Sequence, residues 1–253
     1  KGIGALSNSP VEDMNLGANK LTNLPMEFGT LTSLKTLWLD DNLLETFPIC
    51  ICSITGLEML RITGNQLKSL PQSISTLENL ITLAVDNNNI TEFPTGVLKL
   101  PKLEHLWLRQ NKLSKIPENI EELVLLKTLS LSSNQLTNLP DSLIGMHSLV
   151  NIYVNSNQLN IDGINEEICS LPNLKELNIA NNLFETLPLL WTEMWGDIDT
   201  KKGIYTGKTE SDMTVVKDGD DNLSCTVTVL GNPVLSINES TTASAKKSAQ
   251  IAI

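Results

Sequence analysis

The sequence of 253 residues predicts an α/β solenoid that is right-handed, with a parallel β-sheet on its concave face and an irregular or 3-10-helical convex side. Three observations predict this fold. Of the 43 leucines, 40 fall in residues 1–190. A pattern written L-x-x-L-x-L-x-x-N, with other aliphatic residues at some Leu positions, recurs eight times. Its closing asparagines follow one another at a spacing of 23 residues six times in succession, and then 25, which is typical of stacked repeats.

Each copy of the pattern contains a segment in which aliphatic and variable residues alternate, as in Leu37-Trp38-Leu39. This alternation predicts a short strand whose aliphatic side chains point into a core and whose variable side chains point outward. The asparagine that ends each copy is expected to be buried, with its amide bonded to backbone groups of its own turn and of a neighbouring repeat. The predicted ladder consists of Asn19, Asn42, Asn65, Asn88, Asn111, Asn134, Asn157 and Asn182.

A proline follows most of these asparagines and is expected to end the strand pairing and send the chain to the convex side. The seventh unit is two residues longer than the others and has Asn165 where the proline would stand. The prolines in this position are Pro25, Pro48, Pro71, Pro94, Pro117, Pro140 and Pro188.

These motifs resemble the leucine-rich repeat family, L-x-x-L-x-L-x-x-N-x-L, over about residues 10–188. The 23-residue unit with its Leu-Pro dipeptide is similar to the intracellular-type subclass found in scribble-like and Ras-pathway scaffold proteins. The resemblance implies a horseshoe-shaped solenoid and a role as an intracellular scaffold or regulator, with small GTPases or phosphatases among the implied partners.

The leucine pattern ends near residue 190, and Val227-Thr-Val229 followed by Asn232 restores it. We therefore expect an N-terminal extension over 1–9, a solenoid of eight repeats over 10–188, and a capping segment over 189–238 that includes an insertion and a degenerate ninth strand. Residues 239–253 are expected to form a flexible tail or linker. The alternative for 190–222 is a surface loop.

The outward strand positions form the candidate binding surface, because they face the concave side. They carry two of the four tryptophans and one of the two tyrosines in the chain. Exposed Trp, Tyr and Arg dominate binding hot spots. The alternative is that these bulky side chains only stack on one another and stabilise the sheet. The predicted partner-binding residues are Trp38, Asp40, Arg61, Asp86, His105, Trp107, Arg109 and Tyr153.

The net charge of −11 disfavours nucleic acid as the partner, because phosphate backbones require a cationic surface. Residues 1–188 hold 12 basic and 20 acidic residues, and Asp40, Asp41 and Asp86 lie on the predicted concave face. We therefore expect a protein or peptide partner that carries Lys or Arg groups. No apolar run approaches the ~20 residues that span a bilayer, so no membrane insertion is expected.

Neither a cofactor nor a metal site is predicted. The segment Gly203–Thr209 departs from the phosphate-loop spacing, and Asp218–Asn222 lacks the register of a calcium loop. The cysteines form no C-x-x-C pair, and buried free thiols in a reducing cytosol are the simplest interpretation of Cys50, Cys52, Cys169 and Cys225.

No nucleophile–base constellation stands out, so the leading hypothesis is a non-catalytic protein-interaction module in the cytoplasm. Two alternatives stay open. The chain could be the targeting region of a larger phosphatase, cyclase, kinase or GTPase, or a secreted or surface leucine-rich protein of a pathogen or of host defence. Asn89-Ile-Thr91 matches a glycosylation sequon, and glycan occupancy there would favour the secreted alternative.

Overall fold

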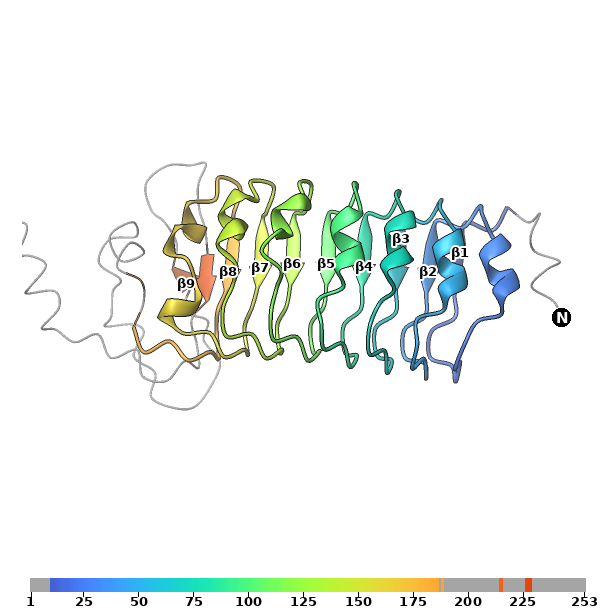
Figure 1. Cartoon of the computed structure of the whole chain (residues 1–253), viewed down its shortest axis with the longest axis horizontal. Helices are drawn as coiled ribbons and strands as arrows, with labels where there is room; N and C mark the ends of the chain where they lie inside the picture. Colours follow the sequence, from blue (N-terminus) through green and yellow to red (C-terminus); the bar gives the residue numbers. More distant parts are fainter. Residues whose placement is uncertain (1–9, 187, 189–213, 216–225, 229–253) are drawn as a thin grey trace, which may run out of the picture.

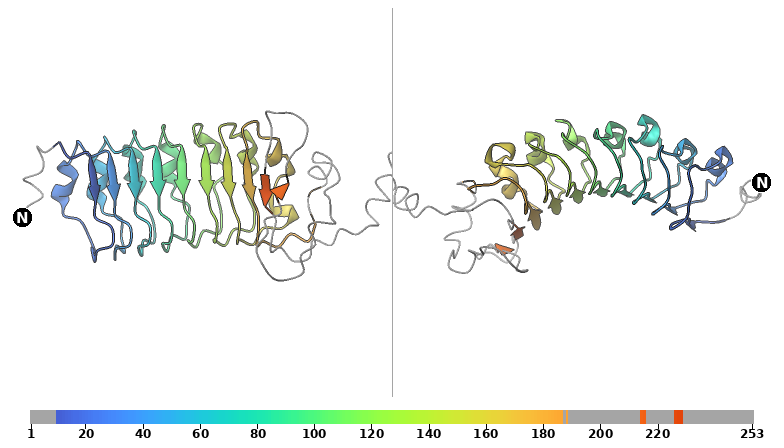
Figure 2. Two further views of the ribbon diagram at one scale, coloured as in Figure 1. Left: turned by 180° about the vertical axis from the view of Figure 1, so that it is seen from behind. Right: turned by 90° about the horizontal axis from the view of Figure 1, so that it is seen from below.

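The computed structural model describes residues 10–186, 188, 214–215 and 226–228. These residues form one curved array with a sheet along one side (Figure 1). Figure 2 shows that the array bends so that the strands lie on the inner side and the helical turns on the outer side. The strands are β1 (Asp13–Asn15), β2 (Thr36–Trp38), β3 (Met59–Arg61), β4 (Thr82–Ala84), β5 (His105–Trp107), β6 (Thr128–Ser130), β7 (Asn151–Tyr153), β8 (Glu176–Asn178), β9 (Thr214–Val215) and β10 (Thr226–Thr228).

Strands β1 to β8 pair in sequence order, and every pair is parallel and in register. The middle residue of each strand therefore lies opposite the middle residue of the next, as Leu83 does opposite Leu106. These side chains point inward, and from β2 to β8 they are fully buried. Stacking thus buries one continuous aliphatic core that no single repeat could bury alone, and the predicted fold class is confirmed.

Short 3-10 helices cover the convex side, as expected. A proline directly precedes most of them, and its carbonyl oxygen accepts the first helical hydrogen bond, as Pro25 O does from Phe28 N. In the longer unit, Asn165 replaces the proline as cap, and its side chain accepts a hydrogen bond from Glu167 N. The helices are η2 (Met26–Thr30), η3 (Ile49–Ser53), η4 (Gln72–Thr76), η5 (Thr95–Lys99), η6 (Ile120–Glu122), η7 (Asp141–Gly145), η8 (Ile161–Gly163) and η9 (Glu166–Ser170).

The ladder asparagines join each repeat to the one before it. Asn111 is representative, because its Nδ2 donates to Val85 O in the preceding repeat and to Leu108 O in its own turn. Its Oδ1 accepts a hydrogen bond from Ile90 N, also in the preceding repeat. The asparagines from Asn42 to Asn182 are buried, whereas Asn19, in the first of the eight repeats, is exposed and donates to carbonyl groups of its own turn.

The residue before each ladder asparagine adopts a left-handed backbone conformation. Gly64 occupies this position once, with φ of 67°. In the other seven repeats a non-glycine residue holds φ between 51° and 57°, which is a conformation that costs free energy for residues with a Cβ. The turn that aims the asparagine inward therefore overrides the local preference of most residues found there. These seven are Ala18, Asp41, Asn87, Gln110, Ser133, Ser156 and Asn181.

Beyond β8 the sheet continues with β10, which pairs parallel to it and places Val227 opposite Leu177. The repeat pattern aligns the same two residues. Strand β9 then pairs antiparallel to β10, which the sequence did not suggest. The predicted extension over 1–9 and the tail over 239–253 lie outside the described residues, as does most of the predicted capping segment.

Candidate binding surface

The outward side chains of β2 to β7 form the candidate surface. The last residue of each strand belongs to its central row, in which Trp38, Trp107 and Tyr153 are half-buried and Arg61 is exposed. Arg109, two residues after β5, is also exposed. At about 4.8 Å between neighbouring strands, the five intervals from β2 to β7 span about 24 Å. The predicted residues therefore share one face, although they are spread along most of its length.

Trp107 and Tyr153 contact each other across an intervening strand. Their ring centroids lie 6.4 Å apart and the ring planes are inclined by 19°, so the rings are stacked. Ser130 of β6 lies between them in the register and is buried. The two rings lean together over this small residue, which is the stabilising contact that the alternative interpretation expected.

Tyr153 is held in place by a residue that the sequence analysis did not select. Its hydroxyl donates a 2.7 Å hydrogen bond to Glu176 Oε2 on the neighbouring strand β8. Burial and the neighbouring Glu176 carboxylate raise the pKa of Tyr153 to about 12. The sequence could have identified Glu176 by its position, because it is an outward-facing residue of the strand next to that of Tyr153.

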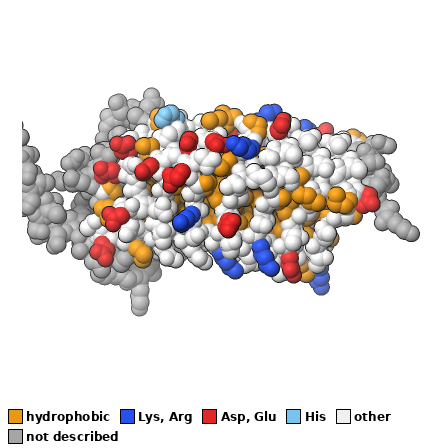
Figure 3. All heavy atoms as spheres, viewed as in Figure 1, with side chains coloured by type: hydrophobic (Ala, Val, Ile, Leu, Met, Phe, Trp, Pro, Cys, Tyr) orange, Lys and Arg blue, Asp and Glu red, His pale blue; other side chains and the backbone are white. Residues whose placement is uncertain are grey.

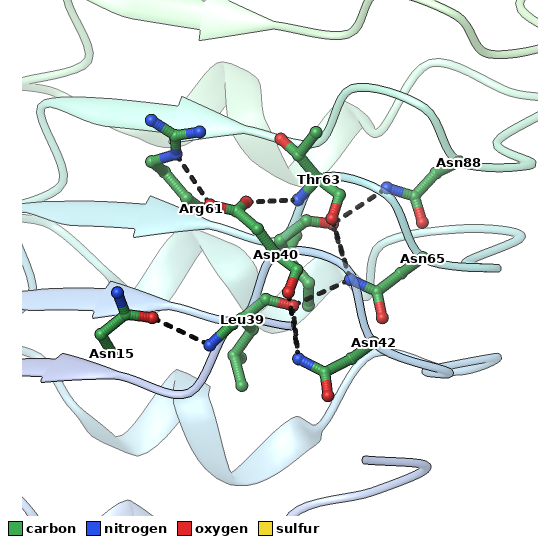
Figure 4. A network of polar contacts seen from close by, with 10 residues as sticks. Asn15, Leu39, Asp40, Asn42, Arg61, Thr63, Asn65 and Asn88 are labelled. Carbon is green, nitrogen blue, oxygen red and sulfur yellow. Dashed lines mark hydrogen bonds and ion pairs between the residues drawn. The ribbon is translucent and has the colours of Figure 1, made fainter. Parts of the chain in front are cut away.

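Trp38 does not join the aromatic pair. It lies on β2, three strands from Trp107, which corresponds to about 14 Å. Its neighbour in the central row is Arg61, whose Nε lies 3.1 Å from Asp40 Oδ2 (Figure 4). Asp40 Oδ1 also accepts a hydrogen bond from the backbone N–H of Thr63. The structure therefore separates an aromatic pair near β6 from a single tryptophan beside an ion pair.

Asp86 contacts Arg109 through the backbone of that residue. Asp86 Oδ1 accepts a 2.6 Å hydrogen bond from the backbone N–H of Arg109. Burial raises the pKa of Asp86 above its usual range, although this hydrogen bond and the charges of Arg109 and Arg61 act in the opposite direction. The acidic residues predicted to attract a basic partner are thus interleaved with two arginines.

His105 lies on the outward face at the start of β5. Its Nδ1 is 3.1 Å from Thr128 Oγ1, and its Nε2 is 4.0 Å from Glu104 Oε2. Glu104 also pairs with Lys127 at 2.8 Å. His105 therefore borders the aromatic pair and has polar neighbours in Glu104, directly before its strand, and in Thr128 on the next strand.

A comparison with protein-family models identifies the family of this chain. The family model described as "Leucine rich repeat" matches residues 9–67 and 78–136. The chain belongs to the leucine-rich repeat family. Leucine-rich repeat proteins are generally non-enzymatic interaction modules, and no catalytic family is indicated by the matches. No protein with a curated description matches the chain.

Several solved leucine-rich repeat structures are similar to this one. A leucine-rich repeat protein of Leptospira interrogans is 35% identical with a TM-score of 0.67, over 69% of this chain and 44% of that one. The plant peptide hormone receptor RGFR1, solved in complex with RGF2, is 27% identical with a TM-score of 0.65, over 76% of this chain and 32% of that one. The chain thus spans less than half the length of either protein.

Internalin C2 of Listeria monocytogenes is 24% identical with a TM-score of 0.62, over 72% of this chain and 76% of that one, and shares the fold.

The rest of the described array offers few other functional features. Its convex side carries scattered charges of both signs and some hydrophobic side chains (Figure 3). Met26, at the start of η2, and Val124, two residues after η6, are exposed. Within the described ranges, no cluster of His, Cys, Asp or Glu could hold a metal ion, and none of the helices is a candidate membrane span.

Burial raises the pKa of the Cys50 and Cys52 thiols, which makes them poor nucleophiles.

The remaining sequence motifs cannot be located in the fold. The phosphate-loop-like segment at Gly203–Thr209 and the acidic segment at Asp218–Asn222 lie outside the described residues, as does Cys225.

Proposed function

We propose that this leucine-rich repeat array is a non-catalytic module that binds a protein or peptide on its concave face. One observation carries the proposal. Trp38, Trp107 and Tyr153 are half-exposed on a parallel sheet whose outward face no other described element covers. Parallel sheets are normally covered on both faces. Large amphipathic side chains on such an open face are suited to a partner that completes their burial.

The stacked Trp107–Tyr153 pair is compatible with this role. Each ring uses one face for the other ring, so the opposite faces and the outer edges stay available for a partner. The pair is also preorganised, because the Tyr153 hydroxyl is bonded to Glu176. A rigid aromatic anchor loses little conformational entropy on binding.

The comparison with the plant receptor supports the same kind of partner. That receptor was solved in complex with RGF2 and is described as a peptide hormone receptor. Its similarity to this chain makes an extended peptide a reasonable occupant of the concave face. The scaffold or regulatory role in the cytoplasm is part of the proposal and rests on the Leu-Pro repeat subclass. The receptor neighbour favours the secreted alternative, which glycan occupancy at Asn89 would support.

Affinity capture from native lysate tests the site. The double variant Trp107→Ala/Arg109→Ala should lose the partners that the wild-type chain captures, because it removes one hot-spot aromatic and the adjacent guanidinium. Its circular dichroism should match that of the wild type.

The matched control is Met26→Ala/Val124→Ala, which removes two exposed apolar side chains from elsewhere on the array. This control should capture the same partners as the wild type. Undiminished capture by the Trp107→Ala/Arg109→Ala variant would contradict the assignment of the site.

A further inference from the structure

Two aspartates at equivalent positions of the array, Asp40 and Asp86, have different partners. They are two repeats apart, and each follows its strand on the outward face. Each also accepts a hydrogen bond through Oδ1 from the backbone N–H of the next repeat, which is Thr63 for Asp40 and Arg109 for Asp86. The backbone thus orients both carboxylates in the same way and leaves Oδ2 as the atom that can differ.

The second oxygen of Asp40 is satisfied within the array. Arg61, which stands in the central row of the next strand, places Nε 3.1 Å from Asp40 Oδ2. The residue at the position of Arg61 beside Asp86 is Trp107, because the register pairs Ala84 with Trp107 as it pairs Trp38 with Arg61. A tryptophan ring cannot supply the charged donor that Arg61 supplies.

Asp86 Oδ2 therefore lacks the ion pair that Asp40 has. In the described part of the chain, no salt bridge or side-chain hydrogen bond involves this oxygen. The nearby Thr63 hydroxyl does not bond it either, since Thr63 Oγ1 is buried with no partner. The raised pKa of Asp86 also indicates an incompletely compensated carboxylate, because the effect of burial outweighs that of the neighbouring arginine charges. The carboxylate is thus half-buried and incompletely compensated.

Trp107 offers the second half of a site. One face of its ring is directed at Tyr153, toward β7. The opposite face is turned away from Tyr153, and the strand on that side of β5 is β4, which Asp86 follows. The small Ala84 stands there in the central row, between Arg61 and Trp107. An aromatic face beside a carboxylate suits a planar cation, since stacking on the ring and the ion pair act together.

We propose that Asp86 and Trp107 form a receptor site for an arginine side chain of the partner. Its guanidinium would donate to Asp86 Oδ2 and stack on the ring face of Trp107 that is turned away from Tyr153. The partner would thereby supply the pair that Arg61 makes internally with Asp40. Arginine fits better than lysine because its guanidinium is planar, weakly hydrated and able to stack. The acidic net charge of residues 1–188 would attract such a partner.

This inference rests on the proposed function, and a small probe tests it separately. N-acetyl-arginine amide is titrated into the whole chain while NMR follows the Trp107 indole and the Asp86 carboxyl carbon. N-acetyl-citrulline amide is the neutral, isosteric control. We expect saturable shifts at both groups with the arginine probe in the millimolar range and none with citrulline. Equal shifts with both probes, or no saturable shift with arginine, would overturn the proposal.

Three variants sharpen the test. Asp86→Asn should weaken the arginine probe at least tenfold, because a charge-assisted bond becomes a neutral one. Glu92→Gln removes an exposed charge from the same repeat, beyond its asparagine turn, and should leave the affinity unchanged. Trp107→Arg should abolish probe binding and lower the pKa of Asp86, since the chain would then supply its own guanidinium as it does at Asp40. Retention of probe binding by Asp86→Asn would contradict the site.

The same variants separate this inference from the proposed function. The arginine site requires that Asp86→Asn lower the capture of the native partner at least tenfold. If Trp107→Ala/Arg109→Ala loses the partner while Asp86→Asn retains it, the concave face binds the partner but the arginine site is wrong. If both variants retain the partner, both proposals are wrong.

Discussion

The two sides of strand β5 differ in what the fold demands of them. The inward Leu106 and the following Leu108 are fully buried, and every repeat has an aliphatic residue at each of these positions except Met14 in the first. The outward His105 and Trp107 have Thr128 and Ser130 as their equivalents on β6. Packing and the asparagine turn fix the inward side, whereas the outward side is free to vary. The difference teaches that stability and recognition are carried by opposite faces of the same short strands.

The largest effect is expected on the inward side. Leu106→Ala should lower the free energy of unfolding by about 2–5 kcal/mol, because it leaves a cavity in a closely packed core. Thr82→Ala, on the outward side of the neighbouring strand, should change it by about 0.5 kcal/mol or less. Denaturant unfolding of both variants measures the contrast. Equal losses would show that the two faces contribute alike.

The second effect tests the bonds between repeats. Asn111→Leu should cost about 1–3 kcal/mol, since it leaves Ile90 N without its side-chain acceptor and removes one of the two amide donors to Val85 O, the other being Asn88. Asn19→Leu should cost less, because the exposed Asn19 bonds only to carbonyls of its own turn. Thermal unfolding compares the two. An Asn111→Leu variant with the wild-type midpoint would contradict the ladder.

The third effect lies on the outward face and depends on pH. The folded-state pKa of Tyr153 is about 12, above the ordinary value of 10.0. The neutral hydroxyl is thus favoured by folding, and its contribution is complete below pH 10 and is lost as the pH rises through about 12.

Absorbance titration measures this directly in a Tyr205→Phe background, which leaves Tyr153 as the one tyrosine. Glu176→Gln should lower the ionisation midpoint of Tyr153, while burial keeps part of the shift. An unchanged midpoint would mean that Glu176 does not contribute to the raised pKa of Tyr153.

The smallest effect concerns the left-handed residue before each ladder asparagine. Gln110→Gly should stabilise the array by up to about 1 kcal/mol, because glycine adopts the φ of 53° without the Cβ clash. Gln135→Gly is the control, since Gln135 is also exposed but has no positive φ. It should not stabilise. Equal changes in the unfolding midpoint would show that backbone strain is not the cause.

The sequence was sufficient for the features that recur in every repeat. The spacing of the leucines and asparagines predicted the strands, their parallel register and the convex turns, because each of these follows from a fixed position in the repeat. Strand β9 could not be predicted, since Thr214–Val215 is too short for any periodic signal. The role of Asn165 as a helix cap was missed because a proline was expected there.

The candidate surface was predictable only as a set of outward positions. The alternation identified Trp107 and Tyr153, but their stacking depends on side-chain torsions and on the small Ser130 between them. The contrast between Asp40 and Asp86 was likewise hidden. Both are aspartates in the same row, and they differ only in which residue the next repeat places beside them.

One variant tests the division between the two faces most directly. Trp38, Arg61, Trp107, Arg109 and Tyr153 are all replaced by Ser, the residue found on the outward face of β6. Partner capture and denaturant unfolding are then measured on the same preparation.

We predict a cooperatively folded array that loses about 0.5–1.5 kcal/mol of stability from the aromatic pair and captures no partner. An array that fails to fold, or that captures the partner as the wild type does, would contradict the account.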